Sequence, residues 1–377
     1  MAEQLSVTEE TTWTAAEAAL FDNPLLDNVA HFLPASRRST RLTLAKVRRG
    51  QELLGVAPVL VLRRYRGTRL LRPDLRARLD RPLGRLSAMT QCLLDTTFLG
   101  FAHEAPFLAR DPAELPAARA AIIGHLKARR DIAAIGITEP AADPATLRQA
   151  GFDSFLQLPL MVAETAGCAD LEAYLARQTP KRRRNMRSEM KLLADAGGRV
   201  RIHPPGQDRA LVDRMHALLI QSAQRNAGLE VPHALLLNDY GSFRAQRQWA
   251  ITVELGGQVI GFFSFLPHRG VMHQLHGGLD YAAGPAVKLY PNLMHAAVVH
   301  AIATGARAVS FGPLNNEAKR RVGVEYPVMS SLWVRNPLKR WFSRNWMVPR
   351  LDVWRGPMPE GPIIASPLYE GRPRVPL

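Results

Sequence analysis

The chain has 377 residues and carries 49 Lys and Arg against 33 Asp and Glu, which gives a formal net charge of +16. Hydrophobic residues make up 47% and charged residues 22%, a composition that excludes a disordered or collagen-like chain, and the length suits two domains. The two cysteines, Cys92 and Cys168, are too few for a disulfide framework or a four-cysteine metal site. The positive charge favours a polyanionic partner, or else reflects a coding bias toward arginine.

The first ten residues are acidic and polar, and they lack the basic and apolar regions of a secretory signal. The longest apolar runs, such as 53–62, reach about half of the ~20 residues that a membrane-spanning helix needs. We therefore expect a cytoplasmic protein in a reducing compartment, with no integral membrane contact.

The first half of the chain is predicted to mix strands and helices. Two apolar segments on either side of Arg49-Gly50 indicate a β-hairpin, and the arginines of 63–85, interrupted by proline and glycine, indicate a loop. In chain order the predicted elements are a helix over 14–21, strands over 42–47, 53–62 and 98–102, a helix over 112–127, a strand over 132–137, a helix over 144–150 and a strand over 152–162.

The second half repeats this order of elements. Turns at Gly256-Gly257 and at 268–270 match hairpin chemistry between its central strands. The predicted elements are helices over 171–178 and 180–196, a strand over 200–203, a helix over 207–225, strands over 249–255, 259–267 and 271–277, a helix over 291–304, and strands over 308–311 and 327–334. Both halves therefore predict an α/β (α+β) fold with a mixed, mostly antiparallel sheet flanked by helices.

The helix over 180–196 carries the strongest cluster of charge. Thr179 can cap it and Pro180 suits its first turn. Consecutive basic residues at a helix N-terminus oppose the helix dipole, so we expect an external anion such as a phosphate to offset them; the alternative is a solvated basic face. The basic residues of this helix are Lys181, Arg182, Arg183, Arg184, Arg187 and Lys191.

Several segments of the second half resemble the GNAT superfamily: TPKRRRNMRSEMK, QVIGFFSF, KLYPNLMHAAVVHAIATGARAVSFGP, and Lys319 shortly after Phe311-Gly312. Within it, they are most similar to the branch that holds the Fem-type aminoacyltransferases and related tandem-GNAT N-acyltransferases. The resemblance covers 165–336 well and the first half only by element order. It implies two tandem GNAT-like domains, at 1–163 and at 164–336, the second being catalytic, followed by an extension at 337–377.

One departure from the superfamily bears on the donor. Acetyltransferases of this superfamily hold the pyrophosphate of coenzyme A on the backbone N–H groups of a glycine-rich turn before the long helix. Here the stretch 284–292 lacks the glycine spacing and contains Pro285 and Pro291, which have no N–H. Resemblance to the Fem-type branch instead implies aminoacyl-tRNA as donor, bound through the basic helix, an amine of a small molecule or peptide as acceptor, and no cofactor beyond the donor.

The strand over 271–277 supplies candidate site residues, because the resemblance places the reacting carbonyl where two central strands separate, and the matching strands here are those over 259–267 and 271–277. Simple alternation puts His273 and His276 on opposite faces, so no metal site is expected. We place His276 toward the site, because the adjacent Gly277-Gly278 permits close approach of a substrate. The alternative is a histidine hydrogen-bonded within the sheet.

Further polar residues follow this strand. Asp280 and Tyr281 bind the acceptor or, for Asp280, form the next turn. Tyr290 donates its phenol to the leaving group or packs on the helix. The predicted catalytic residues are His276, Tyr290 and Asp280, and the predicted substrate-binding residues are His273, Tyr281, Asn315, Asn316, Glu317 and Lys319.

The extension mixes Trp341, Phe342, Trp346 and Trp354 with basic residues and proline, a pattern that suits base stacking, packing across the domains or a membrane surface. Three functions stay open. They are a tRNA-dependent aminoacyltransferase, an acyl-CoA N-acyltransferase with a non-standard pyrophosphate site, and a non-enzymatic nucleic-acid-binding protein. The missing glycine-rich turn favours the first over the second, and the polar residues at 273–281 and 315–319 favour an enzyme over the third.

Overall fold

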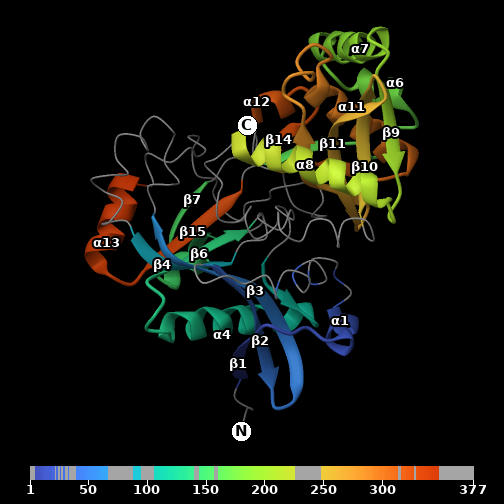
Figure 1. The fold of residues 1–377 in the computed structure, drawn as a ribbon. Coiled ribbons are helices and arrows are strands. Elements are labelled where there is room, and N and C mark those ends of the chain that lie inside the picture. Colours follow the sequence, from blue (N-terminus) through green and yellow to red (C-terminus); the bar gives the residue numbers. More distant parts are fainter. Residues whose placement is uncertain are drawn as a thin grey trace. The chain divides into compact units, whose positions relative to one another are not determined.

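The computed structural model describes residues 5–21, 23, 26, 29, 33, 40–66, 88–94, 106–139, 144–156, 160–225, 248–312, 316–326 and 328–347. The described residues form two compact units, each built on one sheet (Figure 1). Residues up to 156 form the first unit together with 328–347, and residues 160–326 form the second.

The first unit has strand order β1-β2-β3-β4-β6-β15-β7, with β5 beside β3. Its pairs are antiparallel except β4 with β6, which run parallel. Helix α4 (Leu115–Ala128) packs on the sheet through Ile122 and Leu126. The other elements are β1 (Leu5–Glu10), α1 (Ala15–Phe21), β2 (Thr40–Arg49), β3 (Glu52–Arg66), β4 (Ala88–Leu94), β5 (Leu108–Ala109), a short 3₁₀ helix (Pro112–Glu114), β6 (Ala134–Glu139), α5 (Pro144–Gln149), β7 (Asp153–Leu156), β15 (Met329–Val334) and α13 (Pro337–Phe342), with one π-helical turn (Ser343–Met347) after it.

The second unit has strand order β9-β10-β11-β12-β13-β8-β14. Helices α7 and α11 share a core with one face of the sheet, which includes Phe263 and Phe265, whereas α8 packs with Phe262 on the other. The elements are β8 (Leu160–Glu164), α6 (Leu171–Ala176), α7 (Pro180–Asp195), β9 (Arg199–His203), α8 (Arg209–Arg225), β10 (Trp249–Leu255), β11 (Gln258–His268), β12 (Val271–Leu279), α11 (Leu289–Ala303), β13 (Ala308–Ser310), α12 (Asn316–Lys319) and β14 (Val324–Tyr326).

Each sheet contains a strand that the predicted domain limits assign to the other domain, and with these strands the two sheets have corresponding strand orders. The segment predicted as one strand over 152–162 is two strands: β7 pairs with β15 in the first sheet, and β8 pairs with β13 and β14 in the second. β15, which follows the second unit in the chain, lies between β6 and β7. The observed division therefore differs from the predicted limits at 163 and 336, since sheet pairing, rather than chain order, assigns β8 and β15.

The predicted fold class of two tandem, mostly antiparallel sheets flanked by helices is confirmed. The predicted strand over 98–102, most of the arginine-rich loop, and the extension beyond 347 lie outside the described residues. In the part of the chain that the structure describes, no helix is long and apolar enough to span a membrane.

Candidate functional site

The candidate site lies at the point where the pairing between β12 and β13 ends and the two strands diverge. The parallel register between them ends at His273 and Ser310. Beyond it, the Phe311 N–H donates to the Met161 carbonyl at 2.8 Å, and the Met161 N–H donates to the Gly312 carbonyl at 3.2 Å, so this segment continues with β8. β12 meanwhile stays paired with β11 as far as its last residue. β12 and the segment after β13 therefore separate at this point. The strands over 259–267 and 271–277, which were expected to separate, stay paired along their length, so the expected pair of strands was wrong.

A β-bulge on β12 changes which histidines share a face. Pairing with β11 shifts between Ser264 and Phe265, so that His276 lies opposite Ser264 and His273 opposite Leu266. Ser264 and Leu266 are two residues apart and share one face of β11, and directly paired residues share a face. Both histidines therefore lie on the α8 face, and the predicted alternation is wrong here because the bulge inserts one residue, Leu275.

Both histidines are buried, with 7% of His276 and 1% of His273 exposed. The His273 ring lies with its Nε2 3.3 Å from the carbonyl oxygen of His268, a contact within the sheet. His276 lies past the last β12–β13 pair, where the strands have separated. Of the two histidines, His276 therefore has the position that suits a reacting group.

The glycine pair after His276 serves packing. A Cβ on Gly277 would lie 2.6 Å from the Phe263 ring, and a Cβ on Gly278 would lie 2.5 Å from the backbone of Leu218 in α8. The expectation that these glycines make room for a substrate is therefore wrong, since a neighbouring strand and helix occupy that space.

Lys319 lies on the other side of the strand separation. Its side chain is buried, with 5% of the residue exposed. Its ammonium group donates to the Phe311 carbonyl and, at 3.3 Å, to the Gly312 carbonyl, at the end of β13. Burial lowers the pKa of Lys319 to about 7. A lysine of this kind can gain or lose a proton at neutral pH, which an ordinary surface lysine cannot.

The loop between β12 and α11 uses its backbone donors internally. The N–H groups of Ala282 and Ala283 donate to the Asp280 carboxylate at 2.9 and 3.2 Å. Further along, the N–H groups of Gly284, Lys288 and Leu289 donate to backbone carbonyls of the same loop. Asp280 thus forms the turn that was one of its two predicted roles. Five donors that could hold a pyrophosphate are already occupied.

The two tyrosines near this loop make aromatic contacts. The Arg225 guanidinium lies 4.2 Å from the centre of the Tyr281 ring, a cation–π contact with α8. Tyr290, in the first turn of α11, packs edge-on against Phe263 with ring centres 5.4 Å apart. Of the two roles predicted for Tyr290, this contact corresponds to packing.

The remaining predicted substrate-binding residues follow β13. Asn316 and Glu317 belong to α12, but their side chains lie outside the described part of the structure, as does all of Asn315. Within the described residues, no group of three or more His, Cys, Asp or Glu side chains could hold a metal ion.

The basic helix α7 forms as predicted. The Thr179 hydroxyl accepts from the Arg182 N–H at 3.3 Å, and Pro180 occupies the first turn. Arg187 is paired with Glu172 and Lys191 with Asp195, whereas Lys181 and Arg184 are exposed and have no acidic partner among the described residues. The first turn of α7 therefore presents positive charge to solvent.

The buried face of α7 carries an ionic network that sequence reasoning missed. The Glu189 carboxylate, on a residue 6% exposed, lies 2.8 Å from Nε2 of His295 in α11 and accepts from Arg321. Burial opposes ionisation of Glu189, but His295 and Arg321 outweigh it, so its pKa lies below the ordinary value. Asn292 donates to the Glu189 carbonyl at 2.8 Å.

A signal for this network was present in the sequence. Met186, Glu189 and Leu193 are spaced as the apolar stripe of α7, so Glu189 is a carboxylate at a core position. Arg321 lies two residues after Lys319, whose carbonyl accepts from the N–H groups of Val322 and Gly323. The network therefore anchors the segment that carries Lys319.

Comparison with known proteins bears on the fold of the second unit and of the whole chain. A family model described as an acetyltransferase (GNAT) domain matches residues 180–320. No curated protein matches the chain. Among solved structures, L-PGS from Bacillus licheniformis has a TM-score of 0.54 at 10% identity, covering 90% of this chain and 96% of that chain.

Two further solved structures are similar. The C-terminal (DUF2156) domain of a candidate lysylphosphatidylglycerol synthetase from Agrobacterium fabrum has a TM-score of 0.51 at 10% identity, covering 88% of this chain and 94% of that chain. FemX has a TM-score of 0.49 at 11% identity, covering 86% and 98%. The acyl donor of a GNAT domain is itself a substrate, so no separate cofactor is required. Residues 180–320 thus match a GNAT acetyltransferase domain, within a chain of two tandem units that have a GNAT-like fold.

Proposed function

We propose that this protein is an aminoacyltransferase that moves an aminoacyl group from aminoacyl-tRNA to an amine of a small molecule or peptide. The observation that carries the proposal is the N-terminal part of α7, where Lys181 and Arg184 are exposed and lack acidic partners in the described part of the chain. Cations at a helix N-terminus oppose the helix dipole, and a phosphate backbone would offset that opposition. Contacts of this kind supply affinity without reading the base sequence.

The internally bonded loop before α11 argues against the alternative of an acyl-CoA donor. A pyrophosphate held by that loop would need its N–H groups, and those of Gly284, Lys288 and Leu289 already donate to protein carbonyls. A tRNA donor, whose phosphates would contact α7, does not need the N–H groups of this loop.

The proposed reaction forms the amide C–N bond as the acceptor amine attacks the ester carbonyl, and it breaks the C–O bond to the ribose. The amine loses a proton and the ribose oxygen gains one. His276 lies on β12, the ammonium group of Lys319 in α12 contacts the chain at the end of β13, and the Lys319 pKa of about 7 suits proton transfer at neutral pH. We assign the proton transfers to these two side chains without assigning the base to either one.

Neutralising the exposed cations of α7 is expected to weaken tRNA binding. The variant Lys181→Gln/Arg182→Gln/Arg184→Gln should lower affinity for bulk tRNA roughly 10- to 100-fold at physiological salt, and should reduce the slope of log affinity against log salt by about 2. Titration of the purified protein with tRNA and, separately, with acetyl-CoA at low and physiological salt measures both effects.

A matched control removes three charges elsewhere in the same unit: Arg199→Gln/Arg201→Gln/Arg209→Gln, on β9 and α8, should bind tRNA nearly as the wild type does. His276→Ala should also retain tRNA, because it acts on the reaction and not on the donor phosphates. Saturable acetyl-CoA binding, together with tRNA binding that disappears at physiological salt, would instead establish the acyl-CoA alternative.

A further inference from the structure

The short helix α13 presents apolar side chains to solvent. Leu338 is 72% exposed and Trp341 is 62% exposed, the two highest values among large hydrophobic side chains in the described part of the chain; the next reach 42%. Three residues apart on a helix, they lie on the same face. An exposed tryptophan beside an exposed leucine leaves apolar area in water that a partner would cover.

Contacts on the opposite side of α13 fix this orientation. The Arg340 guanidinium forms an ion pair with Asp153 of β7, with Nε donating to Oδ2 at 2.8 Å. Lys339 donates from its ammonium group to the Ala88 carbonyl of β4 at 3.1 Å. The side chain of Asn336 caps the helix by accepting from the Lys339 N–H at 3.1 Å. Because these contacts hold α13 on the first sheet, Leu338 and Trp341 cannot turn inward without breaking them.

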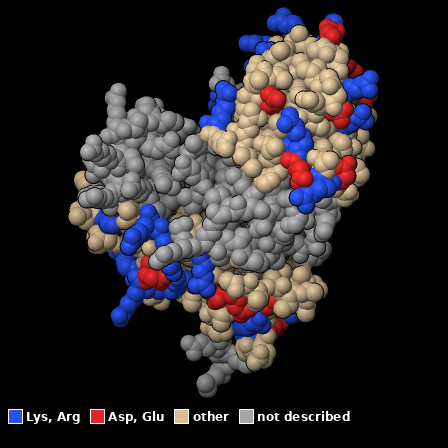
Figure 2. All heavy atoms as spheres, in the orientation of Figure 1, with Lys and Arg blue, Asp and Glu red and all other residues tan. Residues whose placement is uncertain are grey.

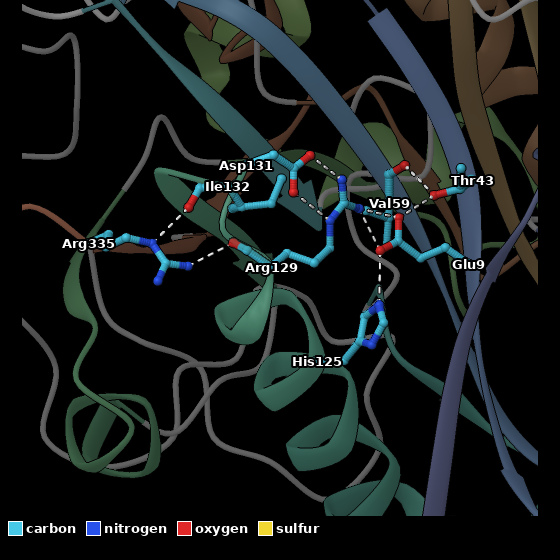
Figure 3. A network of polar contacts seen from close by, with 8 residues as sticks. All are labelled: Glu9, Thr43, Val59, His125, Arg129, Asp131, Ile132 and Arg335. Carbon is cyan, nitrogen blue, oxygen red and sulfur yellow. Dashed lines mark hydrogen bonds and ion pairs between the residues drawn. The ribbon is translucent and has the colours of Figure 1, made fainter.

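The surface around α13 is basic. Arg335, just before the helix, donates to the Ile132 carbonyl at 3.1 Å and to the Arg129 carbonyl at 2.8 Å, contacts that leave its charge unneutralised (Figure 3). Basic side chains gather beside α13, at the left of the view (Figure 2). The described cations here are Lys127, Arg129, Arg335, Lys339, Arg340 and Arg344, against the carboxylates Glu9, Asp131 and Asp153.

We propose that α13 and these cations form a docking surface for an anionic lipid bilayer. Six cations against three carboxylates leave an excess of positive charge that complements anionic headgroups. Trp341 suits the headgroup boundary, and Leu338 suits the acyl region beneath it. A nucleic acid would use the tryptophan and the cations but would leave Leu338 in water. The contact is peripheral, and with only two apolar side chains it is reversible and sensitive to salt.

Flotation with vesicles of equal parts phosphatidylglycerol and phosphatidylcholine tests the docking surface, with pure phosphatidylcholine vesicles as reference. The full-length wild type is expected to float with the anionic vesicles and to stay behind with the neutral ones. Leu338→Ser/Trp341→Ser should weaken this partitioning about 30-fold, because two apolar side chains no longer enter the interface. Arg344→Gln should weaken it roughly fivefold at low salt and less at high salt.

Two controls separate the surface from general effects. Trp341→Phe keeps an apolar aromatic and should retain most of the binding, and Leu192→Ser, a 42% exposed leucine on α7, should bind as the wild type does. Equal flotation of the double variant and the wild type would overturn the proposal. Loss of tRNA binding without loss of flotation in the double variant would also overturn it and would assign the surface to nucleic acid.

Discussion

Lys319→Met is expected to unfold less readily than the wild type at pH 6, although it removes a side chain of the candidate site. The pKa of Lys319 is about 7, against 10.5 for the free side chain, because burial disfavours the charged form. The full difference corresponds to at most about 5 kcal/mol. Methionine fills a similar volume but leaves the Phe311 carbonyl without this donor, which costs about 1–3 kcal/mol. The net expectation is a gain of roughly 2–4 kcal/mol in the free energy of unfolding.

The pH dependence of this gain has a definite sign. Below pH 7 the lysine holds its proton in both the folded and the unfolded chain, and the folded chain bears the full penalty of a buried charge. Between pH 7 and 10.5 only the unfolded chain holds the proton, so the wild type becomes relatively more stable as pH rises. The advantage of Lys319→Met is therefore complete below pH 7 and shrinks toward pH 10.5.

Urea unfolding of both proteins at about pH 6, 8 and 9.5 measures this difference in the free energy of unfolding. A matched control is Lys191→Met, whose ammonium group is exposed and pairs with Asp195 on the surface of α7, and which should change stability little at any of these pH values. A Lys319→Met protein that is less stable than the wild type by the same amount at every pH would show that Lys319 serves structure alone.

Much of the second unit could be predicted from sequence because its signals are local. Thr179 and Pro180 mark the start of α7, and the glycine turns mark the β10–β11–β12 hairpins, as the structure bears out. The bulge on β12 has no such signal, since it depends on how β11 and β12 settle against their helices, and it moved His273 onto the face of His276.

The strand exchange and the Glu189 network depend on contacts between residues far apart in the chain. β15 pairs with β6 across almost two hundred residues, and no local pattern distinguishes it from a strand of its own half. Glu189 and His295 are 106 residues apart. Each stands at an apolar position of its helix, which predicts burial but does not name the partner.

Glu189→Gln is expected to lower the free energy of unfolding by roughly 2–3 kcal/mol at pH 7. The carboxylate accepts from His295, which is 1% exposed, and from Arg321, whose side chain is 47% exposed. An amide oxygen can replace one of these two contacts but not both, and its NH₂ group would face a donor. The expected loss is smaller than the about 3–5 kcal/mol typical of a broken buried ion pair, because Arg321 can return to water.

The deficit of Glu189→Gln should grow as pH rises, so the stability of this variant relative to the wild type falls with pH, as that of Lys319→Met does. Because the folded pKa of Glu189 lies below its ordinary value of 4.5, the stabilisation by ionised Glu189 is complete above pH 4.5 and is lost as pH falls through the folded pKa. Urea unfolding at pH 7 and at pH 4 should therefore show a larger deficit at pH 7. Asp195→Asn, which breaks the exposed pair with Lys191, serves as the matched control and should cost less than about 0.5 kcal/mol at both pH values.

The same variant tests whether the network supports the site. Arg321 follows Lys319 by two residues, and the Tyr174 hydroxyl donates to the carbonyl of Val322, the next residue, so both Glu189 and Tyr174 hold this short segment. Glu189→Gln should therefore release Lys319 from its contacts at the end of β13 and raise its pKa toward the ordinary value as water reaches it. In the double variant with Lys319→Met, the rise in stability from pH 6 to pH 9.5 should equal that of Lys319→Met alone. A single Glu189→Gln variant that keeps the full wild-type rise over this range would show that the network stabilises the core without positioning Lys319.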